Sequence, residues 1–409
     1  IRSKHAYVID KKVTQRKGCR DCEVEEMMPS PSSSIPPNWM IAQTFLSTIF
    51  PLPLSFLWIV ISFPIYFVLT LLGLSANFRL ENDNTNLAHK LFVVTGANCG
   101  IGRFTAAGLA KRGARVILAC RSKQRGLAAQ QNIREEIASV KRENFPHASK
   151  GSVEFMQLDL GDLDSVRAFA NEINSLPRLD GLINNAGLGG GKKECGRTKQ
   201  DLNEVFGVNF IGHFLLTTLL MEKLKSNPDG ARIINLGSVM HRFCTYDFHG
   251  SAMGEDQAFS YANSKMAMIL FTLELRRRLA NTKIVAVAVN PGGVSSEIWR
   301  NIKGVSRWFL NIGMRTLFLD SNQGSATSLF AASRDIPDGY FYFTPYYVPR
   351  FLPGIIFELL GPFSGAHGCV PQVPKGTMEA KISLALWNMT QKLIDAPISP
   401  SDSKTAVAS

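Results

Sequence analysis

The chain has 409 residues, of which 45% are hydrophobic and 19% are charged, and this length predicts one large domain plus appendages. Its formal net charge of +12 comes from scattered basic residues without a long Lys/Arg run, which argues against a nucleic-acid partner and favours a solvated surface that can lie on anionic lipid. The seven cysteines, an odd number, argue against a disulfide framework and favour a reduced compartment.

The first region in chain order is uncharged and apolar. No charged residue stands between Met27 and Phe78, and residues 44–75 exceed the roughly 20 apolar residues that a spanning helix needs. We therefore predict a retained membrane segment at 44–75, after a disordered tail at 1–43. Because prolines interrupt this segment, a re-entrant or interfacial hairpin remains an alternative, as does a cleaved or buried segment.

The charges around this segment predict its orientation. Arg79 and Lys90 follow it, whereas almost no charge precedes it if translation starts at Met27 or Met28; a truncated longer chain is the other explanation for the N-terminal Ile. The positive-inside tendency then places the following domain on the cytosolic side. We expect membrane lipid as a partner, in the endoplasmic reticulum or another organelle.

After the polar stretch 81–86, short apolar runs alternate with helix-like stretches. Such alternation predicts a doubly wound α/β fold, in which helices cover both faces of a parallel sheet. The predicted strands are 91–95, 116–119, 153–158, 181–183, 232–236 and 284–289.

A glycine-rich sequence, TGANCGIG at 95–102, follows the first predicted strand and opens a helix. Glycines at Gly96, Gly100 and Gly102 allow a tight turn and let backbone N–H groups approach a pyrophosphate at the positive end of the helix. The alternative is an ordinary tight turn.

This spacing and four later motifs resemble the short-chain dehydrogenase/reductase family, classical type. The resemblance runs from about Lys90 to Tyr342 and implies a single Rossmann-type doubly wound sheet. We place the catalytic domain at 88–345, a substrate-side extension at 346–395 and a disordered tail at 396–409. The later motifs are LINNAG at 182–187, Asn209 in GVNFIGHF, Tyr261 and Lys265 in SYANSK, and NPGGVSSE at 290–297.

Three details resemble the retinol-dehydrogenase-like branch: the GIGR run ending at Arg103, the ACRS ending of the second strand, and the long gap between Ser238 and Tyr261. The resemblance implies oxidation or reduction of retinoids, steroids, polyprenoids or fatty aldehydes. A protochlorophyllide- or steroid-type reductase is one alternative, and a catalytically silent, membrane-tethered interaction protein of the same fold is another. Family members often pair through helices, which leaves a homodimer open.

The residues after the second strand predict the cofactor. NAD-preferring sites hold a carboxylate there for the ribose 2′-OH, but this chain has Cys120 and then Arg121. An arginine offers a charge-assisted fork to a 2′-phosphate, so we predict NADP(H), although a solvated arginine is the alternative. Asp159 matches the family position that hydrogen-bonds the adenine, unless it serves only as a helix N-cap.

The resemblance implies a catalytic set of Asn209, Ser238, Tyr261 and Lys265. A free phenol has a pKa of about 10, and Lys265 lies one helical turn after Tyr261, so we expect its charge to lower the pKa of this proton donor. Ser238 would hydrogen-bond the substrate oxygen, and Asn209 would support a water chain to the lysine. A capping or turn role is the alternative for both.

The resemblance also implies the remaining contacts. No histidine spacing resembles a zinc site, so we predict no metal and assign His213, His241 and His249 to loops or packing. The aromatic and basic stretches at 298–319 and 346–363 predict either ordinary packing or a lipid-facing substrate entrance. The implied cofactor-binding residues are Thr95, Gly96, Asn98, Gly100, Ile101, Gly102, Arg121, Asp159, Asn185, Ala186, Gly187, Tyr261, Lys265, Pro291, Gly292 and Val294.

Overall fold

The computed structural model describes residues 85–140, 145–147, 150–189, 196–255, 259–294, 319–336, 341–344, 367–368 and 377–395. All of them belong to one compact unit, Phe56–Ser409. The predicted membrane segment at 44–75 and the predicted tails lie outside these residues. Among the helices that are described, none combines the length and apolar character needed to cross a membrane.

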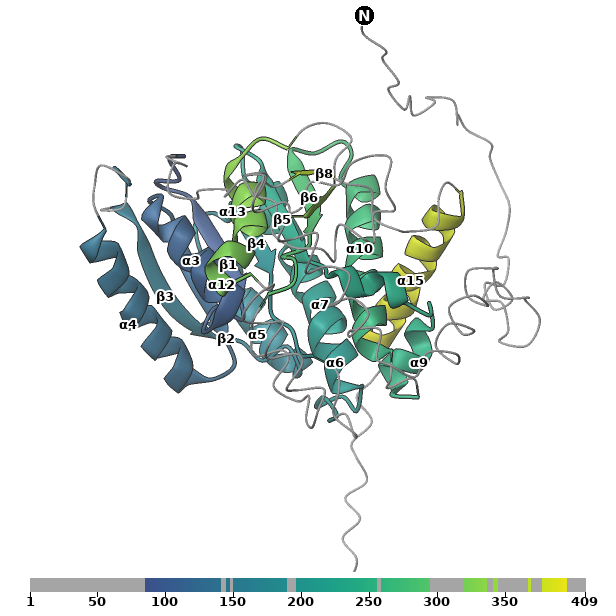
Figure 1. Cartoon of the computed structure of the whole chain (residues 1–409). Helices are drawn as coiled ribbons and strands as arrows, with labels where there is room; N and C mark the ends of the chain where they lie inside the picture. Colours follow the sequence, from purple (N-terminus) through teal and green to yellow (C-terminus); the bar gives the residue numbers. More distant parts are fainter. Residues whose placement is uncertain are drawn as a thin grey trace, which may run out of the picture. The chain divides into compact units, whose positions relative to one another are not determined.

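A single sheet organises this unit (Figure 1). Its strand order is β3-β2-β1-β4-β5-β6-β7-β8, and every neighbouring pair is parallel except β7 with β8. The predicted doubly wound parallel sheet is thus confirmed, and the six predicted strands agree with β1 to β6 to within one residue at each end. The strands are β1 (Leu91–Thr95), β2 (Arg115–Cys120), β3 (Ser152–Gln157), β4 (Gly181–Asn184), β5 (Ala231–Leu236), β6 (Ile284–Val289), β7 (Tyr342–Thr344) and β8 (His367–Gly368).

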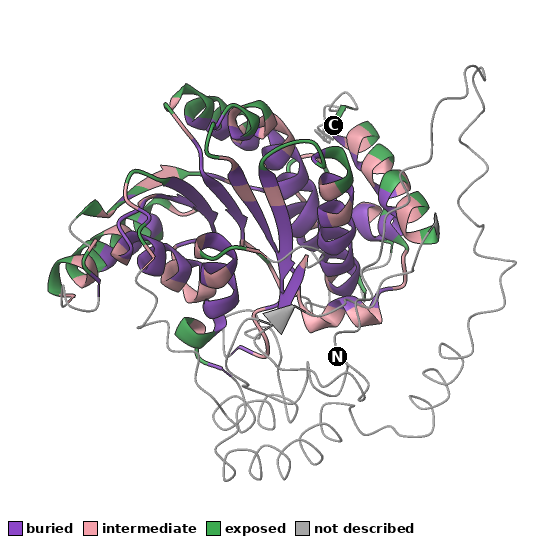
Figure 2. Ribbon diagram, turned by 90° about the horizontal axis from the view of Figure 1, so that it is seen from above, coloured by how far each residue is buried: buried purple, intermediate pink, exposed green. Residues whose placement is uncertain are grey.

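Helices cover both faces of the sheet, and the central strands are buried between them (Figure 2). On one face α3, α4 and α13 enclose a core built from alternate residues of the strands. On the other face lie α5, α7 and α10. The helices are α3 (Gly100–Lys111), α4 (Lys123–Ser139), α5 (Leu163–Ser175), α6 (Glu204–Phe206), α7 (Gly212–Leu219), α8 (Met221–Lys225), α9 (Phe248–Met253), α10 (Ser260–Arg278), α12 (Ser321–Gly324), α13 (Ala326–Ser333) and α15 (Thr377–Asp395), with a π-helical turn η4 (Gly207–Ile211) and a 3-10 turn η5 (Val239–Phe243).

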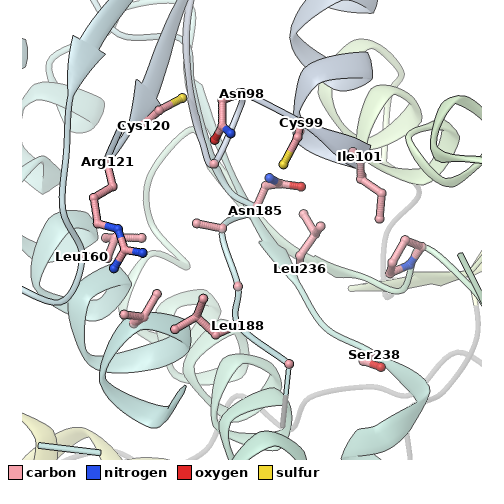
Figure 3. A pocket seen from close by; sticks show the side chains of 18 of the residues that line it. Asn98, Cys99, Ile101, Cys120, Arg121, Leu160, Asn185, Leu188, Leu236 and Ser238 are labelled. Atoms are coloured by element: carbon pink, nitrogen blue, oxygen red, sulfur yellow. The ribbon is translucent and has the colours of Figure 1, made fainter. Parts of the chain in front are cut away.

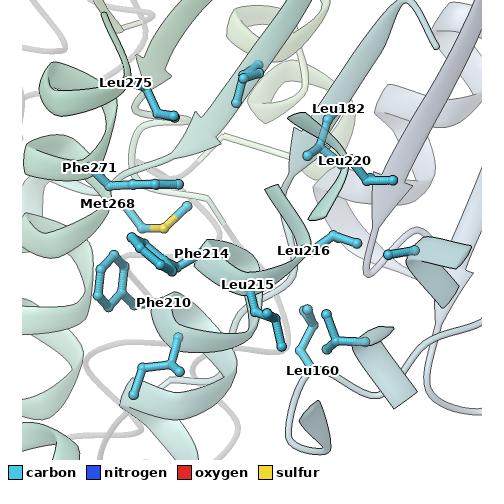
Figure 4. Packing of buried hydrophobic residues seen from close by; sticks show 14 of the residues in the cluster. Leu160, Leu182, Phe210, Phe214, Leu215, Leu216, Leu220, Met268, Phe271 and Leu275 are labelled. Atoms are coloured by element: carbon cyan, nitrogen blue, oxygen red, sulfur yellow. The ribbon is translucent and has the colours of Figure 1, made fainter. Parts of the chain in front are cut away.

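The second face carries the larger hydrophobic cluster, which Figure 4 shows between the strands and α7 and α10. Phe214 and Phe271 pack there with ring centroids 5.1 Å apart. Helix α15 covers the outer side of this pair, because Trp387 stacks edge-on against Phe214 at 4.8 Å. The guanidinium of Arg278 closes the contact, 3.9 Å from the Trp387 ring centroid. This double covering explains why α10 is buried on nearly all sides between Ser260 and Leu275.

The strand order reverses between β1 and β4. Strands β2 and β3 continue on one side of this pair, and β5 to β7 continue on the other. In open α/β sheets such a switch point leaves a crevice at the carboxyl ends of the strands, where ligands bind. The carboxyl ends of β1, β2, β4 and β5 carry the motifs identified in the sequence, so the fold brings them to one edge.

Candidate active site

The glycine-rich turn joins β1 to α3 at this edge. Gly96 has a φ of +65°, which favours glycine, and its N–H donates to the Ala119 carbonyl at 2.8 Å. A Cβ at Gly102 would lie 2.3 Å from the Asn185 side-chain nitrogen and 2.6 Å from the Gly96 carbonyl oxygen. Helix α3 therefore begins tightly against the turn after β4. Its N-cap residue makes no capping side-chain bond, and its first turn holds no acidic residue.

Thr95 is buried behind the turn and does not line the pocket described below. Its hydroxyl accepts the backbone N–H groups of Asn185 and Ala186, each at 2.9 Å. The Asn185 side chain returns a bond to the Thr95 carbonyl at 2.7 Å. The structure therefore gives Thr95 the task of holding the turn after β4, where the sequence predicted direct cofactor contact.

A pocket runs from the end of β2, across the glycine-rich turn, to the start of α10 (Figure 3). All the predicted site residues line it except Thr95 and Asn209, which support it from behind. Further lining residues that the sequence reading did not single out as binding residues are Cys99, Ala119, Cys120, Arg125, Leu158, Leu160, Leu188, Gly189, Glu204, Val205, Val208, Leu236 and Gly237.

At one end of the pocket, cationic and anionic side chains meet. The Arg121 guanidinium, 55% exposed, lies 3.9 Å from the Glu204 carboxylate, which comes from α6. Cys120 is buried, and burial raises the pKa of its thiol to about 12, so it carries no negative charge at neutral pH. The residues directly after β2 therefore supply no negative charge. The carboxylate at this end of the pocket is that of Glu204, from a distant part of the chain.

Asp159 lines the pocket beside this end. One of its carboxylate oxygens accepts the Gly161 N–H at 2.9 Å. The N-cap of α5 is a different residue, Asp162, whose side chain accepts the Asp164 N–H. The alternative of a simple helix cap for Asp159 is therefore wrong, because the chain turns once more before the helix begins.

At the other end, α10 presents Tyr261 and Lys265 to the pocket. The Lys265 side chain is 4% exposed, its Nζ donates to the Leu236 carbonyl at 3.0 Å, and this nitrogen lies 5.7 Å from the Tyr261 ring centroid. Tyr261 and Ser238 are hydrogen-bonded through their side chains. The Ser238 hydroxyl also accepts the Met240 N–H at 3.3 Å, so it caps η5 as well as meeting the tyrosine.

The pKa values of this pair differ from the sequence-based expectation. Burial raises the pKa of the Tyr261 phenol to about 12, and the hydrogen bond with Ser238 opposes that rise only in part. The expected lowering by Lys265 is wrong for this structure: loss of solvation is the largest effect on the Tyr261 pKa, and the group that opposes it is Ser238. Burial also lowers the pKa of Lys265 to about 8.

Asn209 lies in η4, a π-helical turn of the kind that often marks a functional site. Its side-chain oxygen accepts the Leu188 N–H at 2.7 Å, and its side-chain nitrogen donates to the Leu188 carbonyl at 3.0 Å and to the Ser264 hydroxyl at 3.1 Å. Asn209 thus connects the loop after β4 with the helix that carries Tyr261 and Lys265.

Residues 90–305 match the short chain dehydrogenase family, and the chain belongs to that family. It is an oxidoreductase of the retinol-dehydrogenase-like branch. It is 40% identical over 256 residues to retinol dehydrogenase 12 of Mus musculus, covering 61% of this chain and 75% of that protein. It is 37% identical over 318 residues to dehydrogenase/reductase SDR family member 13 of Bos taurus, covering 75% and 74%.

Among solved structures, an uncharacterised protein of Mycobacterium paratuberculosis superposes with a TM-score of 0.56 at 27% identity. The match covers 78% of this chain and 98% of that chain. The fold predicted from the order of the motifs therefore agrees with a known architecture.

Proposed function

We propose that this chain is an NADP(H)-dependent oxidoreductase that interconverts a carbonyl and an alcohol on an apolar, lipid-like substrate. The observation that carries the proposal is that Ser238, Tyr261 and Lys265 line the same pocket as the glycine-rich turn. Relatives named retinol dehydrogenase 12 and retinol dehydrogenase 14 support a retinoid, steroid, polyprenoid or fatty aldehyde as the substrate class.

The residues of the pocket fit a phosphorylated dinucleotide. The start of α3 offers backbone N–H groups and no acidic side chain, which favours a pyrophosphate. Arg121 and Arg125 both line the far end, where a 2′-phosphate would find charge-assisted donors. Leu160, Val205 and Val208 supply an apolar wall beside them, suited to an adenine ring. When bound, the nicotinamide supplies or accepts a hydride.

The side chains at the opposite end would handle the proton. In the proposed reaction Tyr261 gives its phenolic proton to the substrate oxygen during reduction and takes it back during oxidation. Ser238, already hydrogen-bonded with Tyr261, holds the same oxygen. Lys265 places a positive charge behind the phenol and would hold the nicotinamide ribose. An NADPH-rich cytosol would favour reduction.

A turnover screen of the full chain in detergent tests this proposal. NADPH would be supplied with retinal, steroid ketones, polyprenals and fatty aldehydes, and oxidation of NADPH would be followed by its absorbance. We expect turnover with at least one lipid aldehyde. Turnover with a steroid ketone alone would support the alternative of a steroid-type reductase. NADPH binding without turnover on any member would support the catalytically silent protein.

Replacement of Lys265 tests the dual role proposed for this residue. We expect Lys265→Ala to lower kcat by at least about tenfold, within the range of general acid–base catalysis, and to weaken NADPH binding. Because the pKa of Lys265 is about 8, wild-type reduction should decline as the pH rises through that value and the ammonium is lost. Lys283→Ala is the matched control, since Lys283 is exposed and its ammonium donates to the Pro228 carbonyl, away from the pocket lining. A variant with unchanged NADPH affinity would contradict the ribose contact.

Membrane attachment through residues 44–75 remains a proposal based on their uncharged, apolar sequence. Exposure of so large an apolar surface to water would cost far more than a kinked helix loses in lipid. We expect the full chain to sediment with membranes and resist carbonate extraction, while a chain truncated to begin at Glu81 stays in the supernatant and binds NADPH. A full chain that is soluble without detergent would refute the anchor. Protection of the catalytic domain from protease outside sealed microsomes would refute the cytosolic orientation.

A further inference from the structure

His213 lies in the first turn of α7 and is fully buried. Its Nδ1 atom lies 3.0 Å from the Asn209 carbonyl oxygen, and its Nε2 atom lies 2.9 Å from the Thr95 hydroxyl. A carbonyl oxygen can only accept, so Nδ1 carries the ring proton and Nε2 accepts from Thr95. Burial lowers the pKa of this imidazole to about 4, which keeps it in the neutral form that the arrangement requires.

The Thr95 hydroxyl depends on this acceptor. It already accepts the two N–H groups of Asn185 and Ala186, so its own proton must go elsewhere. The other acceptor within reach, the Ile183 carbonyl, is 3.4 Å away, beyond the usual range of about 2.5–3.0 Å for an O–H···O bond. His213 therefore fixes the direction in which Thr95 donates, and with it the two bonds that Thr95 accepts.

The two partners of His213 hold the same loop from opposite ends. Thr95 binds Asn185 and Ala186, and Asn209 binds Leu188 through two hydrogen bonds. Residues 185–188 line the pocket between the glycine-rich turn and Lys265. One imidazole thus joins both anchors of the pocket loop 185–188.

We propose that His213 is a positioning residue, which fixes the pocket loop 185–188 by coupling Thr95 to Asn209. The inference rests on the proposed function, because the loop would border the nicotinamide ribose. Its effect would be felt in cofactor affinity and in kcat, through the alignment of nicotinamide with Tyr261. A histidine that served only in packing, as the sequence predicted, would affect neither cofactor affinity nor kcat.

A double-mutant cycle on the full chain in detergent tests the coupling. The variants are His213→Phe, which keeps an aromatic ring without its nitrogens, Thr95→Val, which removes the hydroxyl, and the pair together. We expect each single variant to weaken NADPH binding about tenfold, in line with loss of a buried hydrogen-bonded partner. The NADPH dissociation constant of the double variant should stay within about twofold of that of the weaker-binding single variant, since both substitutions break the same link. Additive losses would overturn the proposal.

Two further variants keep the test independent of folding. Thr95→Ser retains the hydroxyl, and His213→Gln retains an amide that can reach it, so both should recover most of the NADPH affinity and of kcat. If His213→Phe does not fold, the cycle is run with His213→Leu in its place, which also lacks the ring nitrogens; the expected result is again a non-additive loss. Thr390→Val, which removes a buried hydroxyl on α15 bonded to the Leu386 carbonyl, controls for general destabilisation.

The failure of this inference is distinguishable from failure of the proposed function. A wild-type chain that neither binds NADPH nor turns over any carbonyl refutes the function. A wild-type chain that does both, beside a His213→Phe variant with unchanged NADPH affinity and kcat, refutes only the role of His213. A loss of melting temperature in His213→Phe with unchanged affinity and kcat would likewise show a purely structural residue.

Discussion

Tyr261→Phe is expected to reduce kcat by about 10²- to 10⁴-fold, the usual contribution of a positioned general acid or base. The substitution removes one hydroxyl from α10 and leaves the ring that Lys265 approaches. Because the glycine-rich turn and the arginines are untouched, the dissociation constant of NADPH should change by less than about twofold. Steady-state turnover assays with the best substrate of the screen measure kcat, and a fluorescence titration of NADPH measures its dissociation constant.

Tyr246→Phe is the matched control for this prediction. Tyr246 is also a partly buried phenol whose pKa is raised by burial, but it does not line the pocket. Its loss should leave kcat unchanged. A decrease of less than tenfold in Tyr261→Phe would mean that another group transfers the proton and that the mechanism assigned to this site is wrong.

The motifs could be read from the sequence because their geometry is local. The turn between β1 and α3 needs its glycines within eight residues, and Tyr261 and Lys265 share a helix face through their spacing alone. The central strands were equally visible, since parallel strands buried on both faces are continuous apolar runs. Most of the residues that line the pocket can therefore be predicted from the sequence.

The contacts that it missed join distant segments. Glu204 reaches Arg121 across 83 positions of sequence, and His213 reaches Thr95 across 118. Strands β7 and β8 were missed because they have only three and two residues. They are recognisable as strands only through their pairing, β7 with β6 and β8 with β7. The direction of the Tyr261 pKa shift was missed for a related reason: spacing reveals a nearby charge, but burial is a property of the whole fold.

The contact between Arg121 and Glu204 decides how cofactor preference should respond to mutation. In wild type, Arg121 has an anionic neighbour at 3.9 Å, which a 2′-phosphate would displace or share. Glu204→Gln removes the competing charge while the side chain stays of similar size. We therefore use it as the matched partner of Arg121→Asp, expecting it to strengthen NADP(H) binding and leave NAD(H) binding nearly unchanged.

Arg121→Asp is expected to reverse the cofactor preference that we propose, from NADP(H) to NAD(H). The new carboxylate would repel the 2′-phosphate and accept from a free 2′-OH, while Glu204 would add a second negative charge at the same end of the pocket. Loss of a charge-assisted bond costs about 1.5–3 kcal/mol, so NADPH affinity should fall by at least about tenfold from this term before repulsion is counted. Parallel titrations of both cofactors against wild type, Arg121→Asp and Glu204→Gln give the ratio directly. A wild-type chain that binds NADH more tightly than NADPH would overturn the role proposed for Arg121, and a shift toward NADPH in Glu204→Gln would then assign the preference to Glu204.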